Sequence, residues 1–146
     1  MKTPDTVYPD APRIAVGAVV FKQHRVLLVK RGKPPAQALW AIPGGSVKLG
    51  ETLQQAAERE ILEEAGITIA AREPLFVFDM VERDETGRVR FHYLIVDLAA
   101  DYISGELQAG DDAESARWVA AEELNALPVS ATTVDLLCNK LKFGRQ

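Results

Sequence analysis

The chain has little of the chemistry that several common classes of protein require. It contains one cysteine among 146 residues, which excludes an intrachain disulfide and a cysteine-cluster metal site. Its 17 basic residues are outnumbered by 21 acidic ones, so it lacks the excess positive charge that nonspecific binding to nucleic acid requires. The first 13 residues are polar and include three prolines, which argues against a signal peptide or a membrane span. We therefore expect a cytoplasmic protein that binds neither nucleic acid nor membranes.

The composition otherwise suits one domain with a sizeable core. Apolar residues make up 47% of the chain and charged residues 26%. The sequence has no internal repeat, no low-complexity tract and no linker to a second domain. We expect a single domain over residues 1–146, in which residues 1–12 form a loose lead-in.

Local patterns predict both strands and helices. Strands are predicted at residues 14–21, 26–30, 39–43, 46–47, 75–83, 88–98 and 116–119. Helices are predicted at residues 52–65, 121–126 and 132–141, with a loop at 32–38 and irregular structure at 101–112. Strands combined with a central and a terminal helix predict an α+β fold, in which a mixed β-sheet lies between helical layers.

The segment from Gly45 to Ile67 carries the strongest functional signal. Between Glu51 and Glu64 it holds five glutamates and one arginine, a local charge of 1 − 5 = −4 that equals the formal net charge of the chain. So much negative charge on one helix is costly unless positive charge neutralises it. Divalent cations are the obvious candidates.

The glutamates of this segment fall on one face of the predicted helix. The helix is expected to begin with an N-cap at Thr52 and to end before Gly66. Its apolar residues recur at three- and four-residue steps and should face the core: Leu53, Ala56, Ala57, Ile61 and Ala65. Glu60, Glu63 and Glu64 stand at i, i+3 and i+4 and share a second face. Carboxylates at this spacing suit Mg²⁺ or Mn²⁺.

The acidic helix face and the neighbouring Arg59 also have ordinary explanations. An acidic helix face is often simply a solvated surface. Arg59 beside Glu60 is either an orienting contact or a surface ion pair worth a few tenths of a kcal/mol. The adjacent glycines Gly44 and Gly45, after a short predicted strand, favour a binding site, since they let a ligand approach main-chain atoms closely.

The spacing of these residues resembles a known family motif. The segment from Gly45 matches the Nudix box, Gly-x5-Glu-x7-Arg-Glu-(aliphatic)-x-Glu-Glu-x-Gly-(aliphatic), at every defined position. The resemblance implies an α/β/α sandwich with a central mixed β-sheet, the Nudix fold. It also implies a hydrolase that uses Mg²⁺ or Mn²⁺ to cleave a nucleoside diphosphate linked to another moiety.

The resemblance further implies a set of metal ligands. Glu63 and Glu64 are the chief ligands, joined by Glu60 and by the carbonyl of Gly44. An acidic residue near the metals is also common before the last strand of the family, and Asp112 aligns best with it. Glu114 is the rival for that position, and a solvated acidic turn is the ordinary alternative for both.

Catalytic roles follow from the same resemblance. Glu60 is the best candidate for the general base, with Arg59 orienting it. In some relatives the base is an acid outside the box, which here would be Asp112 or Glu114. Glu51 would lie nearby as a metal ligand or as the partner of Arg59.

Binding of the substrate is expected to involve residues on both sides of the box. Gly45 and Glu51 belong to the box itself. Arg31 ends a predicted strand beside Lys30 and Lys33, where it would supply positive charge to a pyrophosphate or would be an ordinary basic strand end. The expected partner is a small-molecule nucleotide, and a homodimer is left open.

The favoured substrate is ADP-ribose or a similar nucleoside diphosphate sugar. The alternative is a nucleoside triphosphate, cleaved to a monophosphate and pyrophosphate. Arg83, Asp84 and Glu85 occupy the window in which relatives that act on ADP-ribose often carry a proline, so that marker is missing. Two other classes fit less well. A nucleotide-sensing module would have lost the glutamate pairs, and an isoprenoid diphosphate isomerase needs a cysteine near its active-site strands, whereas Cys138 falls in the last helix.

Overall fold

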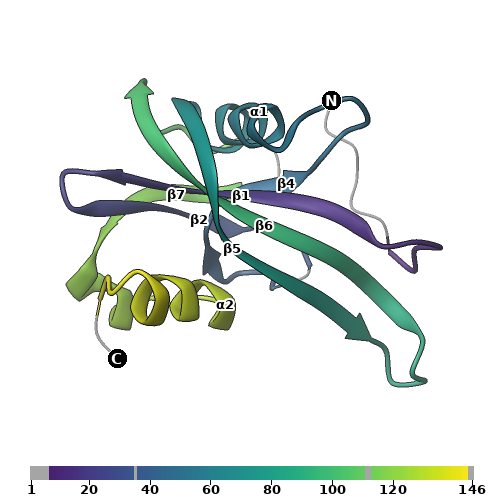
Figure 1. Ribbon diagram of the computed structural model, residues 1–146. Helices are drawn as coiled ribbons and strands as arrows, with labels where there is room; N and C mark the ends of the chain where they lie inside the picture. Colours follow the sequence, from purple (N-terminus) through teal and green to yellow (C-terminus); the bar gives the residue numbers. More distant parts are fainter. Residues whose placement is uncertain (1–6, 35, 111–112, 145–146) are drawn as a thin grey trace.

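A mixed β-sheet forms the centre of the molecule, with helices on both of its faces (Figure 1). The computed structural model describes residues 7–34, 36–110 and 113–144. Within these residues the strands are β1 (Arg13–Lys22), β2 (Arg25–Arg31), β3 (Trp40–Ala41), β4 (Gly44–Ser46), β5 (Thr68–Arg83), β6 (Val89–Ser104) and β7 (Ala113–Ala120). The order in the sheet is β3-β2-β1-β6-β5, with β4 also paired to β1 and β7 to β2.

The central strand β1 separates two cores. It pairs in parallel with β6 and antiparallel with β2 and β4. Because side chains alternate along a strand, Val16, Ala18 and Val20 pack into one core, whereas Val19 packs into the other. The first core lies under helix α1 and the second under the C-terminal helical segment.

Helix α1 (Leu53–Ala65) covers the first core. It begins with a capping box, in which the Thr52 hydroxyl accepts from the Gln55 amide and the Gln55 side chain accepts from the Thr52 amide. It ends at Gly66, whose φ of 75° is open to glycine at little cost. The helix buries the predicted apolar stripe, apart from the partly buried Leu53: Ala56, Ala57, Ile61 and Ala65.

The opposite face is covered by the C-terminal part of the chain (Figure 1). It consists of a 3₁₀ helix, η1 (Ala121–Ala126), a short α-helix, α2 (Ala131–Val134), and a π-helical continuation, η2 (Asp135–Lys140). Cys138 is buried in η2 beside apolar neighbours, as its expected place in the last helix requires. The predicted α/β/α sandwich with a central mixed β-sheet is therefore confirmed.

The sequence underestimated two strands. β5 begins at Thr68 rather than at residue 75, and β6 continues to Ser104 rather than ending at residue 98. The missed part of β5 contains Pro74, around which the register with β6 shifts on both sides. Proline is tolerated here because β5 is an edge strand of the sheet. Pairing over the whole length of β6 therefore overrides the weak local signal.

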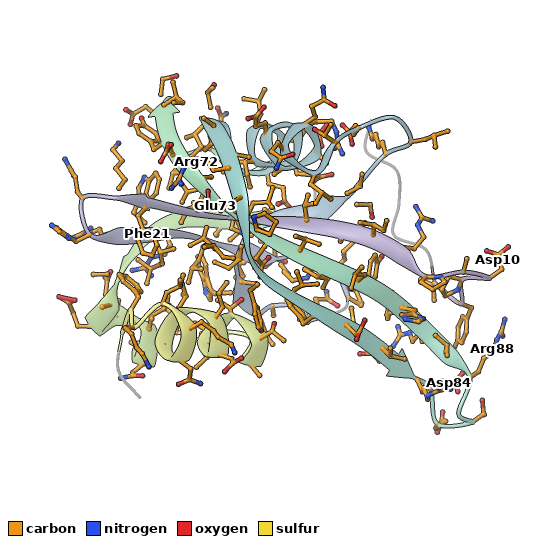
Figure 2. The ribbon with its side chains drawn as sticks, viewed as in Figure 1. Asp10, Phe21, Arg72, Glu73, Asp84 and Arg88 are labelled. Atoms are coloured by element: carbon orange, nitrogen blue, oxygen red, sulfur yellow. The ribbon has the colours of Figure 1, made fainter. Side chains whose placement is uncertain are left out.

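The described part of the expected N-terminal lead-in contacts the hairpin between β5 and β6 through Tyr8. The hairpin between β5 and β6 turns at Asp84 and Arg88, which lie at its tip, away from α1 (Figure 2). The Tyr8 hydroxyl donates to Asp84 at 2.8 Å, and the Arg88 guanidinium lies 4.2 Å from the Tyr8 ring centre. None of the helices in the described residues has the length and apolar character of a membrane span.

The capping box makes a direct prediction about stability. Thr52→Ala removes the acceptor for the Gln55 amide and should lower the free energy of unfolding by about 1 kcal/mol. Thr52→Ser keeps the hydroxyl and should stay close to the wild type. Urea unfolding followed by circular dichroism measures both. Equal losses in the two variants would show that the cap does not contribute through this hydrogen bond.

Candidate active site

Arg59 is the centre of a dense group of charged side chains on α1 and in the residues just before it. Its Nε and Nη2 donate to the two carboxylate oxygens of Glu51 at 2.6 and 2.8 Å. Its Nη1 donates to Glu60 at 2.7 Å and to Glu63 at 3.3 Å. Nη2 also donates to the Ser46 carbonyl at 3.0 Å. One guanidinium therefore holds three carboxylates and the end of β4 together.

These contacts shift the ionisation of both partners. The hydrogen bonds from Arg59 lower the pKa of Glu51 to about 2, against the opposing effect of desolvation. The same bonds raise the pKa of Arg59 above its ordinary value. Both groups are charged at any pH at which the protein would work. The predicted role of Glu51 as the partner of Arg59 agrees with this geometry.

The glycines of β4 let the strand lie directly on the carboxylates. A Cβ at Gly45 would stand 2.5 Å from Glu60 Oε1, so only glycine fits there while Glu60 keeps its place. The Gly44 amide donates to Glu64 Oε1 at 2.9 Å. Glu60 is 1% exposed and Glu64 3% exposed. The adjacent glycines of the sequence thus bring main-chain atoms against two buried carboxylates.

The oxygen atoms of this group suit a hard divalent cation, but the Arg59 guanidinium lies among them. Glu60, Glu63, Glu64 and the main chain of Gly44 offer only oxygen ligands, which Mg²⁺ and Mn²⁺ prefer. In the described residues, no three acidic, histidine or cysteine side chains already converge on one point. Glu60 and Glu63 instead point toward the guanidinium. A cation would have to take over part of the charge compensation that Arg59 provides.

A cavity of about 450 Å³ opens beside this group of residues. It lies on the α2 side of the sheet, since its walls include the start of α2 and side chains of β5 and β6 that face away from α1. Its rim carries Glu64, Gly44 and Gly45, and its apolar wall consists of Leu39, Ile42, Phe78, Met80, Tyr93 and Ile95. The volume and the mixed lining suit a small organic ligand whose charged end meets the carboxylates.

One side of the cavity is tied to the C-terminal segment by hydrogen bonds. The Trp40 amide donates to the Pro128 carbonyl at 2.8 Å, and the Ser130 amide donates to the Trp40 carbonyl at 2.9 Å. The Ile42 amide donates to the Thr133 hydroxyl at 3.3 Å. Residues 40–42 and the start of α2 therefore form one continuous wall.

The predicted basic residues separate in the structure. Arg31, at the end of β2, lines the cavity and is placed where a phosphate could reach it. Lys30 lies 3.8 Å from Glu114 in an ion pair whose side chains are both more than a third exposed, which is worth little. Lys33 is not among the residues that line the cavity.

The acidic turn before β7 is only partly described. Asp112 lies outside the described residues. The segment that leads to it packs on the end of α1, where the Gly110 amide donates to the Glu64 carbonyl at 3.0 Å and the Gln108 amide to the Ala65 carbonyl at 2.8 Å. Position 112 is thus two residues from a contact with α1, and Asp112 as a metal ligand stays a prediction.

Asp97 is a cavity residue that the sequence analysis missed. It lies in the middle of β6 and is 6% exposed, and it borders the cavity together with Arg31, Glu64 and Glu82. Burial raises the pKa of its carboxyl to about 7. A signal was present in the sequence, since Asp97 is the only charged residue between His92 and Asp101. A lone carboxyl in an otherwise apolar strand is unusual enough to mark a site.

The mixed sheet between helical layers, with a glycine strand packed on a glutamate-rich helix, defines the class to which the chain belongs. A family model described as the NUDIX domain matches residues 11–138. The chain belongs to the NUDIX family. The predicted family is thereby confirmed.

Individual relatives agree with this assignment. The chain is 38% identical over 117 residues to an ADP-ribose pyrophosphatase of Methanocaldococcus jannaschii, a match that covers 80% of this chain and 65% of that protein. The crystal structure of a MutT NUDIX hydrolase from Burkholderia pseudomallei has a TM-score of 0.71 and 31% identity, covering 85% of this chain and 94% of that one. A bifunctional NMN adenylyltransferase/ADP ribose pyrophosphatase from Francisella tularensis, complexed with AMP and a Mn ion, has a TM-score of 0.69 and 26% identity, covering 90% of this chain and 42% of that one.

Removing the central guanidinium should destabilise the fold. Arg59→Gln leaves Glu51, Glu60 and Glu63 facing one another without a cation, so the free energy of unfolding in chelator should fall by about 3 kcal/mol. Arg72→Gln is the matched control, since Arg72 is about half exposed in its pairs with Glu73 and Asp101. That control should lose less than about 1 kcal/mol. Similar losses in both variants, measured by chemical unfolding, would contradict the central role of Arg59.

The raised pKa of Asp97 predicts a dependence of stability on pH. The pKa is about 7 in the folded protein and near 3.8 in the unfolded chain, so ionisation costs the folded state stability as the pH rises between these values. The stability of Asp97→Asn relative to wild type should therefore grow from pH 4 to pH 7 by a few kcal/mol at most and then level off. Chemical unfolding of both proteins at each pH measures this difference. A flat difference for Asp97→Asn would contradict the prediction.

Proposed function

We propose that the protein hydrolyses the pyrophosphate bond of a nucleoside diphosphate linked to another moiety, and that ADP-ribose or a similar nucleoside diphosphate sugar is its substrate. The products are a nucleoside monophosphate and a phosphorylated remainder. The observation that carries this proposal is the meeting of Glu64 and the β4 glycines with a cavity of about 450 Å³. The carboxylate that would bind cations and the apolar wall that would contact the nucleoside thus border the same cavity.

The proposed metal ligands are Glu60, Glu63, Glu64 and the Gly44 carbonyl, with Asp112 as an additional ligand. Bound Mg²⁺ or Mn²⁺ would supply neutralisation of the phosphate charge and a more acidic water. The protein's own part is to hold the carboxylates in position before the substrate arrives. Arg59 does this by bonding Glu60 and Glu63 from one side.

Glu60 is proposed as the general base. It is buried, it packs on Gly45, and a 2.7 Å hydrogen bond from Arg59 fixes one of its oxygens. Of the rivals outside the box, Glu114 is exposed and pairs with Lys30. Asp112 lies outside the described residues and stays the alternative. A base must be positioned as well as basic, and Glu60 is held by Arg59 on its own helix and by the packing of β4.

The cavity supports a nucleotide whose phosphates lie toward Glu64 and whose organic parts lie along the apolar wall. Phe78 and Tyr93 supply aromatic surface for a base or a sugar, and Arg31 supplies positive charge for a phosphate. The names of the M. jannaschii and F. tularensis relatives both include ADP-ribose pyrophosphatase activity. Hydrolysis of nucleoside triphosphates to a monophosphate and pyrophosphate is the second candidate.

A substrate panel tests the activity. Purified protein is incubated with ADP-ribose, ADP-glucose, ATP and dGTP in Mg²⁺, in Mn²⁺ and in EDTA, and the products are resolved by ion-exchange chromatography. We expect AMP from ADP-ribose in either metal and no turnover in EDTA. Faster release of pyrophosphate from the triphosphates would select the second candidate. Full turnover after exhaustive chelation would contradict the metal mechanism.

Substitutions on α1 separate the base from the ligands. Glu60→Gln should lower kcat by roughly 10²–10⁴-fold with little change in KM or in the Mg²⁺ concentration for half-maximal rate. Glu64→Gln should mainly raise the Mg²⁺ requirement. Glu58→Gln is the control on the same helix, since Glu58 only accepts a hydrogen bond from the Ala71 amide. A Glu60→Gln enzyme restored by excess Mg²⁺ would make Glu60 a ligand rather than the base.

A further inference from the structure

Asp97 lies in register with two glycines on neighbouring strands, Gly17 and Gly44. Gly44 of β4 pairs with Gly17 of β1, and Gly17 pairs with Asp97 of β6. Two strand spacings separate Gly44 from Asp97, which puts their Cα atoms roughly 10 Å apart. The flanking residues Val96 and Leu98 pack into the core under α1, so the side chain of Asp97 lies on the opposite face of the sheet, which is the side of the cavity.

The strand beside Asp97 makes room for its side chain. A Cβ at Gly17 would overlap Asp97 Oδ1 and would stand 3.1 Å from Ile42 Cγ2. Gly17 has no positive φ that would otherwise demand glycine. The space above Gly17 is thus taken by the Asp97 carboxyl, which leans from β6 across β1 toward β4.

Nothing that holds the fold together needs this carboxyl. The Asp97 side chain makes no hydrogen bond and no ion pair to any of the described residues, although Asp97 is only 6% exposed. Burying an unpaired carboxyl is unfavourable, and an apolar residue would serve the surrounding strand better. The neighbouring cavity positions of β6 are Tyr93 and Ile95, so the carboxyl is a polar point at the end of an apolar wall.

We propose that Asp97 determines specificity by accepting hydrogen bonds from neutral donor groups of the substrate, either ribose hydroxyls or the amino group of the base. The inference rests on the proposed function. A carboxylate offers acceptor positions on two oxygens and repels phosphate, so it selects the uncharged part of a nucleotide. The phosphates are then directed toward Arg31, the basic residue that lines the same cavity. A donor from the ligand satisfies the carboxyl that the protein leaves unsatisfied.

The test combines variants of the protein with variants of the substrate. Asp97→Asn is compared with wild type for ADP-ribose, for analogues with a 2′-deoxy or 3′-deoxy adenosine ribose or a deoxygenated terminal ribose, and for IDP-ribose, which lacks the amino group. For ADP-ribose we expect kcat/KM to fall about 10-fold or more, mainly through KM. One analogue lacks the donor that Asp97 binds. With that analogue, kcat/KM of the wild type should fall as much as kcat/KM of Asp97→Asn falls with ADP-ribose, and Asp97→Asn should show no further loss. That analogue identifies the source of the donor.

Two further variants serve as controls for the effect of Asp97. Asp101→Asn removes a carboxylate from the same strand at an exposed position outside the cavity, and should leave the analogue pattern unchanged. Gly17→Ala should raise KM in wild type by displacing Asp97, but should add little to Asp97→Ala, in which the space is free. Additive effects of the last two would show that Gly17 acts independently of the carboxyl.

The outcomes distinguish this inference from the activity on which it rests. If wild type cleaves ADP-ribose and Asp97→Asn matches it on every analogue, the inference about Asp97 is overturned and the proposed function stands. If Asp97→Asn lowers kcat alone and KM stays constant for all analogues, Asp97 acts in the chemistry rather than in recognition, which also overturns the inference. If wild type cleaves none of the nucleoside diphosphate sugars, the proposed function fails first.

Discussion

The contact between Arg59 and the glutamates of α1 is the interaction on which the rest of the site depends. One guanidinium faces Glu51, Glu60 and Glu63, so a charge of −2 remains on these four side chains. Glu64, bonded to the Gly44 amide, adds to the negative charge nearby. Arg59 therefore lets the carboxylates lie close together in the folded protein without cancelling their negative charge, which the proposed function requires for cations. A second arginine in this place would stabilise the protein and weaken the site.

The site joins the two faces of the sheet at one edge. Helix α1 lies on one face, and the cavity lies on the other, under the start of α2. The short strand β4 connects them, because its glycines let the carboxylates of α1 approach the main chain from one face and leave it open to the cavity on the other. A larger side chain at either glycine would separate the charged group from the cavity. Under the proposed function, chemistry and recognition meet at these two glycines.

The sequence predicted helix α1 well, because the signals for it are local. The capping residue, the apolar stripe and the glutamate spacing all lie within one helix, whose period fixes which side chains share a face. The lengths of β5 and β6 depend on pairing between distant residues, and Pro74 obscured the start of β5. Asp97 was missed for a similar reason. Its neighbours Gly17 and Ile42 come from other strands and loops, and only the fold places them beside it.

The hydrogen bonds of Trp40 to both sides of residue 129 have an optical consequence. The indole is 8% exposed and lies in the wall between β2 and α2, with the Arg117 guanidinium 5.8 Å from its ring centre. The same wall continues through Ile42 to Thr133 and borders the cavity. A ligand that displaced this wall would shift the cation relative to the ring and would alter the emission of Trp40, whereas Trp118 packs against Tyr102 in the core under α1. Trp40 is thus placed to report a movement of this wall by its fluorescence, at equilibrium and without a label or a turnover assay.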